Sequence, residues 1–565
     1  MKPVTIFLGR MRPVLLLLAL VLAGSCGDEV TNTTNPDSEG TNTGSGSGIT
    51  ITVAGVQDGA TIHSGFLGGS ASVGQSRVVD LVEVSLDSRP FATASLVSST
   101  DWTFPLPTGT AMWRNGSLHT IAVRAVDRDG NLSPVKTFTV RKGPNRDVNG
   151  DGYADLAVGA SGYNAAQDGK AYLYYGTPAG ILSGLSNTAA TALSGSGGGN
   201  FGRSVKLGDV NGDGYADLAV GAPFFGSTGA AFLFLGSAAG IPSGDDSTAA
   251  TILIGPASNF FGMTVALGDV NGDGLEDLAV GAPFVGSTGA AYIFLGSAAG
   301  IPSGSFSTAD TAFTGPSGSN STATVALGDT NGDGYADLAL GVNSASSLAG
   351  QTYLFLGSAA GIPSGVFSAA FSTLTGLSNS RFGTHVALGD VNGDGIADLV
   401  VGATSASGFA GAAYLFHGSP VSIPTGDTTT ASTTLTGTSS SQFGVSLALD
   451  DVNGDGAADL AVGAYAASSN AGAVYLFHGS PTGVPTGDFS TAATTISGVA
   501  SSGLSRVALG DVNGDGFADL GAGANSLGAA YLFYGAAAGI ASGAATTAPT
   551  ILNGVGNQFG VSLEL

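Results

Sequence analysis

Cysteine is almost absent from this chain of 565 residues, and histidine, tryptophan and charged residues are scarce. The single cysteine excludes a disulfide framework within the chain, because a disulfide needs two. Charged residues make up 10% of the sequence, yet 41 acidic residues stand against 17 basic ones, for a formal net charge of -24. Binding to nucleic acid, or to anionic lipid headgroups by charge, is therefore not expected, because both need a basic surface.

Long apolar stretches are also lacking, apart from the run 14–22 near the start of the sequence. This run is too short to span a bilayer and follows basic residues, which is typical of an export signal. It ends in Ala-Gly-Ser-Cys, which resembles the bacterial lipobox, whose cysteine is lipidated. We therefore expect a lipoprotein signal over residues 1–26, a lipid on Cys26, and export to the outer membrane or cell surface. The alternative is an ordinary signal peptide cleaved near Ala23 or Ser25.

Two regions precede the long repetitive part of the chain. Residues 27–48 are rich in Thr, Asn, Ser and Gly, and we expect a flexible tether. Residues 49–142 alternate apolar and polar side chains in short runs, which predicts half-buried strands. The stretch 119–140 resembles the final hairpin of bacterial immunoglobulin-like domains, which implies a β-sandwich that acts as a spacer or, alternatively, as a binding domain. Gly143-Pro144 interrupts the last strand, so we place the domain boundary there, between 49–142 and 143–565.

A motif, Asp-x-Asn-Gly-Asp-Gly-x-x-Asp, repeats through the rest of the chain. Successive copies are separated by 62, 60, 60, 61, 61 and 60 residues, which indicates a repeat architecture. Each unit contains four short strand-like segments and no predicted helix, as in a blade of a β-propeller. The seven copies begin at Asp147, Asp209, Asp269, Asp329, Asp390, Asp451 and Asp511.

The two ends of the repeat region predict a closed ring. The first unit begins at its acidic motif without a strand before it, whereas residues 559–565 match the strand that precedes other motifs, such as 443–449. A strand missing at one end and supplied by the other closes a propeller and removes its open edges. We therefore expect an all-β chain with a seven-bladed propeller; an open solenoid, the alternative, would show atypical capping units.

Each motif predicts a calcium loop. Side-chain oxygens at positions 1, 3, 5 and 9 and a backbone carbonyl at position 7 suit a hard cation, and Ca²⁺ enters such a cage more readily than Mg²⁺. An EF-hand is excluded because position 12 is apolar in every copy and the flanks are strands. The alternative is a set of solvated Asx turns that need no ion. We expect up to seven Ca²⁺ ions, with these ligands: Asp147, Asn149, Asp151, Tyr153, Asp155; Asp209, Asn211, Asp213, Tyr215, Asp217; Asp269, Asn271, Asp273, Leu275, Asp277; Asp329, Asn331, Asp333, Tyr335, Asp337; Asp390, Asn392, Asp394, Ile396, Asp398; Asp451, Asn453, Asp455, Ala457, Asp459; Asp511, Asn513, Asp515, Phe517, Asp519.

The repeats resemble FG-GAP repeats, the blades of the integrin α-subunit propeller. The resemblance rests on the acidic motifs, on Phe-Gly pairs such as Phe201-Gly202, and on Gly-Ala-Pro at 221–223 and 281–283. Ser321-Thr322 and Gly503-Leu504 replace Phe-Gly in the fourth and seventh units, where we expect looser packing. The resemblance implies that calcium stabilises the blades and that ligands bind mainly on the opposite face.

Aromatic residues follow the second predicted strand in several units, which places them at the face away from the acidic loops. They are Tyr163, Phe224, Phe225, Phe284 and Tyr465. Such a rim could bind a glycan or a protein, and the alternative is that these rings pack between neighbouring blades.

The sequence therefore predicts a calcium-binding, lipid-anchored cell-surface binding or adhesion protein. Its expected partner is a surface protein or glycan of unknown identity, and its contact with a membrane is through the N-terminal lipid. An architectural role in a surface layer or matrix is the alternative. An enzyme acting on polysaccharide or lipid is not expected, because the histidines and carboxylates form no catalytic set apart from the repeats.

Overall fold

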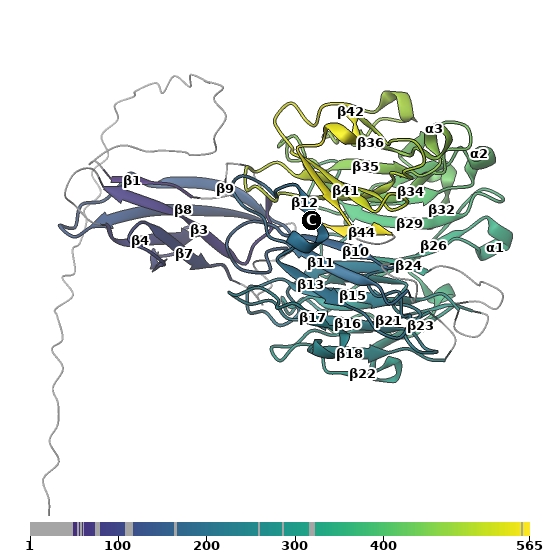
Figure 1. The fold of residues 1–565 in the computed structure, drawn as a ribbon, viewed down its shortest axis with the longest axis horizontal. Coiled ribbons are helices and arrows are strands. Elements are labelled where there is room, and N and C mark those ends of the chain that lie inside the picture. The colour runs from purple at the N-terminus through teal and green to yellow at the C-terminus, as the bar shows by residue number, and fades with distance from the viewer. Residues whose placement is uncertain are drawn as a thin grey trace, which may run out of the picture. The chain divides into compact units, whose positions relative to one another are not determined.

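A computed structural model describes residues 49–53, 56, 59, 61–73, 79–107, 113, 117–162, 167–257, 260–284, 288–315, 323–554 and 558–565 (Figure 1). The expected signal, Cys26 and the tether lie outside these residues. Within the described ranges, no helix has the length and apolar character needed to cross a membrane.

The N-terminal part forms two sheets around one hydrophobic core, which includes Trp102, Val84 and Phe138. Every second residue of its longest strand, Leu118–Asp127, is buried, as the alternating sequence predicts. The strand orders are β1-β3-β7-β6 and β2-β9-β8-β4-β5. The strands are β1 (Ile49–Ile51), β2 (Thr61–Ile62), β3 (Phe66–Val73), β4 (Val79–Leu86), β5 (Ala92–Thr93), β6 (Ser95–Leu96), β7 (Asp101–Pro105), β8 (Leu118–Asp127) and β9 (Lys136–Lys142).

The repeat region forms seven sheets of one topology, which we call blades 1 to 7. Each blade has four antiparallel strands and a two-residue parallel strand at its outer edge. The inner strands, for blades 1 to 7, are β44 (Phe559–Glu564), β14 (Ser204–Gly208), β19 (Thr264–Gly268), β24 (Ala323–Gly328), β29 (Phe382–Gly389), β34 (Phe443–Asp450) and β39 (Arg506–Gly510). The second strands are β10 (Leu156–Ala160), β15 (Asp217–Ala222), β20 (Asp277–Ala282), β25 (Asp337–Val342), β30 (Asp398–Ala403), β35 (Asp459–Ala464) and β40 (Asp519–Ala524).

The outer strands follow the same order of blades. The third strands are β11 (Lys170–Tyr174), β16 (Ala230–Phe234), β21 (Ala290–Phe294), β26 (Gln351–Phe355), β31 (Ala412–Phe416), β36 (Ala473–Phe477) and β41 (Ala529–Phe533). The fourth are β13 (Thr191–Ser194), β18 (Thr251–Ile254), β23 (Thr311–Thr314), β28 (Ser372–Thr375), β33 (Thr433–Thr436), β38 (Thr494–Ser497) and β43 (Thr550–Asn553). The short edge strands are β17 (Gly244–Asp245), β22 (Gly304–Ser305), β27 (Gly365–Val366), β32 (Gly426–Asp427), β37 (Gly487–Asp488), β42 (Gly543–Ala544) and β12 (Gly184–Leu185).

Short helical turns connect some of these strands. One-turn helices join the second and third strands in blades 4 to 6: α1 (Ala345–Leu348), α2 (Ala406–Phe409) and α3 (Ala467–Asn470). A three-residue 3-10 turn precedes each fourth strand: η1 (Ser186–Thr188), η2 (Asp246–Thr248), η3 (Phe306–Thr308), η4 (Phe367–Ala369), η5 (Thr428–Thr430), η6 (Phe489–Thr491) and η7 (Ala545–Thr547).

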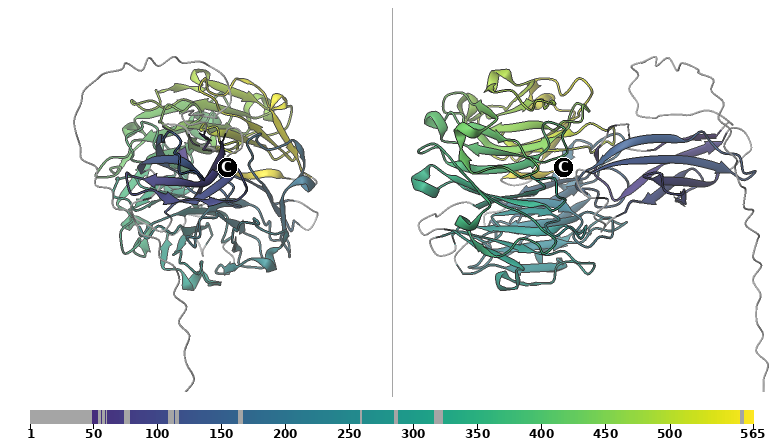
Figure 2. Two further views of the ribbon diagram at one scale, coloured as in Figure 1. Left: turned by 90° about the vertical axis from the view of Figure 1, so that its left-hand side faces the viewer. Right: turned by 180° about the vertical axis from the view of Figure 1, so that it is seen from behind.

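The ring is closed by the C-terminal strand, as predicted. Strand β44 pairs with β10 of the first unit, with Val158 opposite Leu563, although the two segments lie at opposite ends of the repeat region. The edge strand β12 extends the sheet of blade 7 in the same way, through pairing with β43. Successive inner strands contact one another around the whole circle, and the further views in Figure 2 show the blades arranged about it. This is the arrangement of β-propeller blades.

The Phe-Gly pairs explain how neighbouring blades pack. Phe201 is fully buried against Phe234 of the third strand, with ring centroids 6.1 Å apart. Gly202 has a φ of +82°, and a Cβ atom there would lie 2.1 Å from the carbonyl oxygen of Lys170. Only glycine fits this close approach of two backbones.

Blade 7 keeps the same packing without a phenylalanine. Leu504 is fully buried and forms the backbone bridge to Gly472 that Phe201 forms to Gly169. The looser packing expected from Gly503-Leu504 is therefore not observed, because the chain is displaced by one residue and places Leu504 in the phenylalanine slot. Ser321-Thr322 of blade 4 lie outside the described residues.

Candidate functional site

The acidic motifs connect the inner and second strands at the same end of every blade. The position 1 carboxylate folds the loop around itself: in blade 3, Asp269 accepts hydrogen bonds from the backbone N–H groups of Gly272 (2.6 Å) and Gly274 (2.7 Å). The bond from the position 6 glycine occurs in all seven loops. Both glycines have positive φ, +73° and +84°, which explains why the motif contains them.

Positions 3 and 5 are linked to each other in the same loop. Asn271 Oδ1 accepts the backbone N–H of Asp273 at 2.9 Å, and Asn271 Nδ2 donates to Asp273 Oδ2 at 3.1 Å. The position 7 residue, Leu275, donates its N–H to Asp273 Oδ1 at 2.9 Å. The predicted ligands of one loop are thus neighbours in space, joined by short hydrogen bonds.

The position 9 aspartate anchors the loop inside the blade. Asp277 accepts the N–H of Val270 with one oxygen and that of Gly296, after the third strand, with the other, both at 2.8 Å. The equivalent bonds occur in all seven blades. All seven position 9 aspartates are fully buried, at 0% exposure.

Successive loops are also joined to one another. The position 8 N–H donates to the position 1 carbonyl of the preceding loop, for example from Ala336 to Asp269 at 2.7 Å. The bond from Ala154 to Asp511 completes the circle between the first and last loops. The loops therefore form one hydrogen-bonded ring at this end of the blades.

The carboxylates of these loops are desolvated and close to one another. Burial, and next to it the charge of neighbouring aspartates, raises the pKa of Asp147 and Asp511 to about 7. Burial raises the pKa of Asp217, Asp277 and Asp459 to about 8.

Positive charge near these carboxylates is sparse. Among the described position 1 and position 9 aspartates, Asp390 lies 3.8 Å from Arg141, and the charge of Lys142 acts on Asp209 to lower its pKa against the effect of burial. Asp398 lies 3.2 Å from Nδ1 of His417, which is a cation only when protonated. Buried carboxylates without a counter-charge are costly to keep ionised.

The loops fit a calcium ion by their donor chemistry. Every candidate ligand is an oxygen atom, and a divalent cation would neutralise the buried charge. As the side chains stand, no three His, Cys, Asp or Glu in the described ranges surround a common metal position, because the carboxylates bind backbone N–H groups instead. In their hydrogen bonding the loops are Asx turns. The alternative interpretation requires these turns to be solvated, whereas the position 9 carboxylates are fully buried.

The N-terminal part contacts these loops, which no pattern in the sequence predicts. Ser64 Oγ donates to Asp147 Oδ2 at 2.7 Å, and the ring of Phe66 packs on Tyr215 with centroids 5.0 Å apart. Asn145 Nδ2 donates to the carbonyl oxygen of Gly214 at 2.8 Å. The acidic loops of blades 1 and 2 are therefore both engaged by residues outside the motif.

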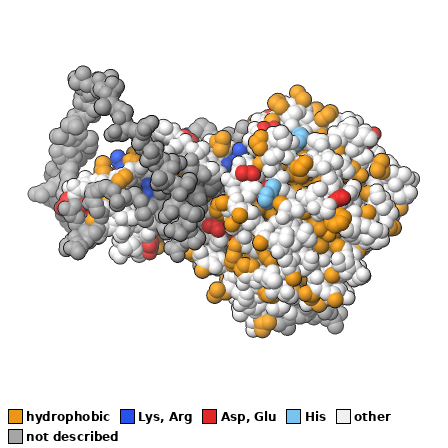
Figure 3. Space-filling model, turned by 90° about the horizontal axis from the view of Figure 1, so that it is seen from above, with side chains coloured by type: hydrophobic (Ala, Val, Ile, Leu, Met, Phe, Trp, Pro, Cys, Tyr) orange, Lys and Arg blue, Asp and Glu red, His pale blue; other side chains and the backbone are white. Residues whose placement is uncertain are grey.

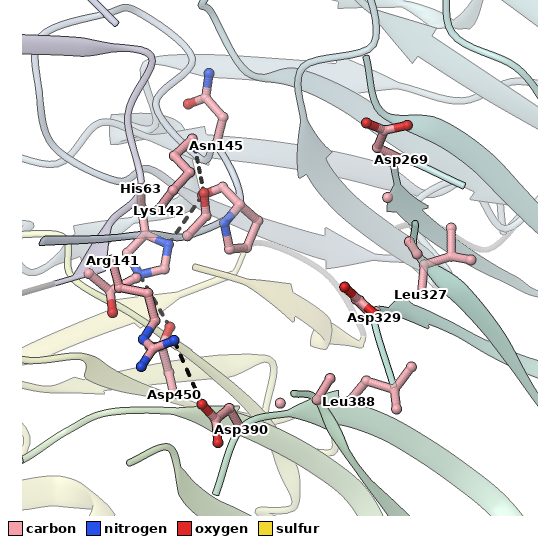
Figure 4. A pocket seen from close by; sticks show the side chains of 18 of the residues that line it. His63, Arg141, Lys142, Asn145, Asp269, Leu327, Asp329, Leu388, Asp390 and Asp450 are labelled. Atoms are coloured by element: carbon pink, nitrogen blue, oxygen red, sulfur yellow. Dashed lines mark hydrogen bonds and ion pairs between the residues drawn. The ribbon is translucent and has the colours of Figure 1, made fainter. Parts of the chain in front are cut away.

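A cavity of about 310 Å³ lies between the N-terminal part and the loop ends of the blades. Figure 4 shows His63 and Arg141 on one side of it, with Asp390 beside Arg141, and Asp269 and Asp329 on the other. His63 Nε2 lies 3.4 Å from Asp450 Oδ2, and burial lowers the pKa of this histidine to about 4. The N-terminal part thus contacts the loop face, while position 5 aspartates such as Asp273 and Asp394 remain exposed.

The aromatic residues predicted for the other face form a chain across blades 2 and 3. Phe224 and Phe284 both pack edge-on against Phe260, with ring centroids 4.7 Å and 5.0 Å away. Phe224 remains 42% exposed, whereas Phe225 turns inward onto Phe232 of its own blade. Sequence reasoning missed Phe260, because it lies next to a Phe-Gly pair.

Two other predicted rim residues remain. Tyr465 is half-buried and lies beside Gly503. Tyr163 is outside the described residues.

Comparisons with known proteins agree with the repeat pattern. The FG-GAP repeat model matches residues 145–174, 201–234, 261–294, 321–355 and 382–416, and an FG-GAP-like repeat model matches 451–522. The matched segments contain all seven acidic loops in full.

Three curated proteins illustrate the relationship. The chain is 39% identical over 152 residues to phosphatidylinositol-glycan-specific phospholipase D of Bos taurus, covering 24% of this chain and 18% of that protein. It is 40% identical over 107 residues to integrin alpha-3 of Mus musculus, covering 18% of this chain and 10% of that protein. Against integrin alpha-PS5 of Drosophila melanogaster the identity is 40% over 146 residues, covering 24% and 14%.

The matched stretches thus span less than a fifth of the length of these curated relatives. These matches relate the chain to a type of repeat that occurs both in integrin α chains and in a phospholipase D. The chain contains FG-GAP repeats and is similar in part of its length to integrin α chains and to phosphatidylinositol-glycan-specific phospholipase D.

Proposed function

We propose that this chain is an exported, lipid-anchored protein that binds Ca²⁺ in its seven acidic loops and a surface protein or glycan on the opposite face. The observation that carries the calcium proposal is the buried position 9 aspartate, repeated in every blade, with a pKa near 8 in blades 2, 3 and 6. Burial destabilises the ionised form of such a carboxylate, and a divalent cation beside it stabilises that form.

Calcium would act on stability in this proposal. An ion that binds the folded chain and not the unfolded one adds roughly 2–4 kcal/mol per site at about a hundred to a thousand times its dissociation constant. Because each loop donates a hydrogen bond to its neighbour, an ion in one loop would also steady the next.

We place the ligand-binding site on the face opposite the acidic loops, because the N-terminal part contacts the loop face. Residues such as Ser64 and Phe66 pack on the loop face. The opposite face carries exposed aromatic rings at Phe224 and Phe409. Charged side chains are sparse on the side of the blades that Figure 3 shows. A surface poor in charge suits recognition by aromatic stacking and hydrogen bonds. The similarity to proteins named integrin α chains also supports a binding role.

Thermal unfolding tests the calcium proposal. We expect the melting temperature of the full chain to rise strongly on moving from chelator to Ca²⁺, and much less in Mg²⁺. Asp277→Asn should reduce the rise, whereas Asp80→Asn, at an exposed residue of β4, should leave it unchanged. Equal melting temperatures in chelator and Ca²⁺ would contradict the proposal.

We further propose that the chain acts by binding and not by catalysis. Pull-down from surface extracts, with and without chelator, would identify the partner. Activity on a polysaccharide or lipid that follows the protein through purification would overturn this part. A Ca²⁺-dependent increase of particle size with protein concentration would instead favour the architectural alternative.

A further inference from the structure

The inner strands enclose a second cavity, of about 420 Å³, that is lined by residues of all seven blades. We call it the central channel. Its volume is in the range of small-molecule sites. The acidic loops lie at one end of the inner strands, so the beginnings of these strands lie toward the opposite face.

One level of the channel is rich in hydrogen-bond donors. Each inner strand pairs one residue with the glycine of the second strand, and these residues form a collar: Ser562, Ser204, Thr264, Thr324, His385, Ser446 and Arg506. Ser204 and Ser446 accept the backbone N–H of Val265 (3.1 Å) and Val507 (3.3 Å) with their oxygens. Their hydroxyl hydrogens are thus available to donate elsewhere.

Two blades depart from the hydroxyl pattern, and both departures introduce nitrogen donors. His385 takes the position in blade 5, and Arg506 takes it in blade 7. Arg203, next to the collar residue Ser204, adds a second guanidinium from blade 2, where blade 3 has Met263.

The channel therefore concentrates positive charge in an acidic protein. Its lining contains Arg146, Arg203, Lys206 and Arg506 against Glu276 and Glu564, four cations to two carboxylates, in a chain of net charge -24. Lys206 forms an ion pair with Glu564, and Arg146 pairs with Glu564 and Asp450.

The remaining guanidinium groups lack a counter-charge. Among the described residues neither Arg203 nor Arg506 forms an ion pair, and the buried Nε of Arg506 and Nδ1 of His385 have no hydrogen-bond partner. The repeat-region residues outside the description contain no Asp or Glu that could supply one. Burial and the charge of Arg203 lower the pKa of Arg506 to about 10, and burial, then Arg506, lowers that of His385 to about 3.

We propose that the central channel binds a tetrahedral oxyanion, a phosphate or sulfate group, through Arg203, Arg506 and His385. A tetrahedral group presents oxygens in several directions and so serves donors that come from three different blades, whereas a carboxylate presents two oxygens in one plane. The hydroxyls of Ser204 and Ser446 complete the set of donors. The hydroxyls of Ser562 and Thr324 already donate to backbone carbonyl oxygens. The group belongs either to a free inorganic ion or to a ligand such as a sulfated or phosphorylated sugar, for which the cavity has room.

Calorimetric titration of the full chain tests this proposal. The probes are sodium sulfate, sodium acetate, glucose 6-sulfate and glucose, at constant ionic strength in a chloride buffer that contains Ca²⁺. We expect saturable binding of sulfate and glucose 6-sulfate, and weaker binding of acetate. Tighter binding of glucose 6-sulfate than of sulfate identifies a sugar ester as the source, and equal or weaker binding identifies the free ion.

The variants use residues that other blades carry at the same place, so that the fold is kept. Arg506→Ser and Arg203→Met should each weaken sulfate binding about tenfold or more, because each removes a charged donor. Arg381→Gln is the matched control: Arg381 is exposed, has a φ of +55°, and its counterpart in blade 6 is Gln442 with a φ of +54°. It should bind sulfate as the original chain does.

Three results would overturn the proposal. They are an absence of saturable sulfate binding, binding of acetate as tight as that of sulfate, and unchanged binding in Arg506→Ser and Arg203→Met. If either arginine variant fails to melt cooperatively, His385→Ser gives the same test from the other side of the collar. The anion proposal and the calcium proposal can fail separately, because the titration probes the channel and the melting experiment in chelator and Ca²⁺ probes the acidic loops.

Discussion

The two ends of the inner strands differ in how strictly they repeat. At the loop end, all seven blades carry the same aspartates with the same backbone hydrogen bonds. At the channel, most blades carry small hydroxyl or alanine side chains, and a few carry Arg203, His385 or Arg506. What every blade repeats is what a blade needs in order to fold, and what one blade carries alone is free to serve a specific contact. The predictions below test this distinction.

The largest effect is expected for a repeated glycine. Gly202→Ala should lower the free energy of unfolding by about 3–5 kcal/mol, because the new Cβ would lie 2.1 Å from the carbonyl oxygen of Lys170 at a φ of +82°. Denaturant unfolding in Ca²⁺ measures it. Gly408→Ser is the control: Gly408 has a φ of +69° and open space around it, and Ser347 and Ser469 hold the equivalent position in other blades. An equal loss in both variants would show that positive φ, and not the close contact, explains the Phe-Gly motif.

A second effect concerns pH at the loop end. In chelator, the folded-state pKa values of Asp217, Asp277 and Asp459, about 8, exceed the unfolded value of 3.8. The folded chain then binds more protons than the unfolded chain over this interval, so stability falls as pH rises toward 8. The buried His63, His385 and Lys142, whose pKa values are lowered to about 4, 3 and 8, bind fewer protons in the folded chain than in the unfolded one and oppose this trend. Their opposition is the smaller effect, because each histidine is only half protonated in the unfolded chain at pH 6.5 and Lys142 loses its proton only near pH 8.

Melting curves at several pH values measure this dependence. In chelator the melting temperature should fall from pH 6.5 to pH 8, and the gain on adding Ca²⁺ should grow, because the ion replaces the proton. A metal-free melting temperature that rises over this interval would show that the loop carboxylates are ionised without a cation.

The repeated features are also the ones that the sequence predicted. The period of the acidic motif, the Phe-Gly pairs and the match between 559–565 and 443–449 are patterns along the chain, and the closing strand β44 follows from them. Features that occur once gave no such signal. The bond from Ser64 to Asp147 and the stacking of Phe260 between Phe224 and Phe284 join segments whose sequences do not repeat.

The placement of Leu504 shows a further limit of sequence patterns. Aligning the motifs puts Gly503 opposite the phenylalanine, but the backbone bridge to Gly472 is made by Leu504. The side chain of Leu504 is buried in place of the phenylalanine, and Gly503 has no side chain to bury there. A gap-free repeat alignment does not include the free energy of burying this side chain. The three donors in the channel were missed for a related reason, since Arg203, His385 and Arg506 meet only after the ring has closed.

The smallest effect on stability is expected at the channel. This prediction is the most stringent test of the distinction between repeated and unrepeated residues. Arg506→Ser removes a guanidinium that has no ion-pair partner in the described part of the chain and restores the hydroxyl that other blades carry. In chloride buffer its free energy of unfolding should equal that of the original chain or exceed it by up to about 1 kcal/mol, because an uncompensated partly buried charge is lost. In sulfate the order should reverse, since a bound anion stabilises only the chain that keeps the arginine. A clear loss of stability in chloride would make Arg506 a structural residue of blade 7, and the rule that unrepeated residues serve binding would then fail at the position where it is most specific.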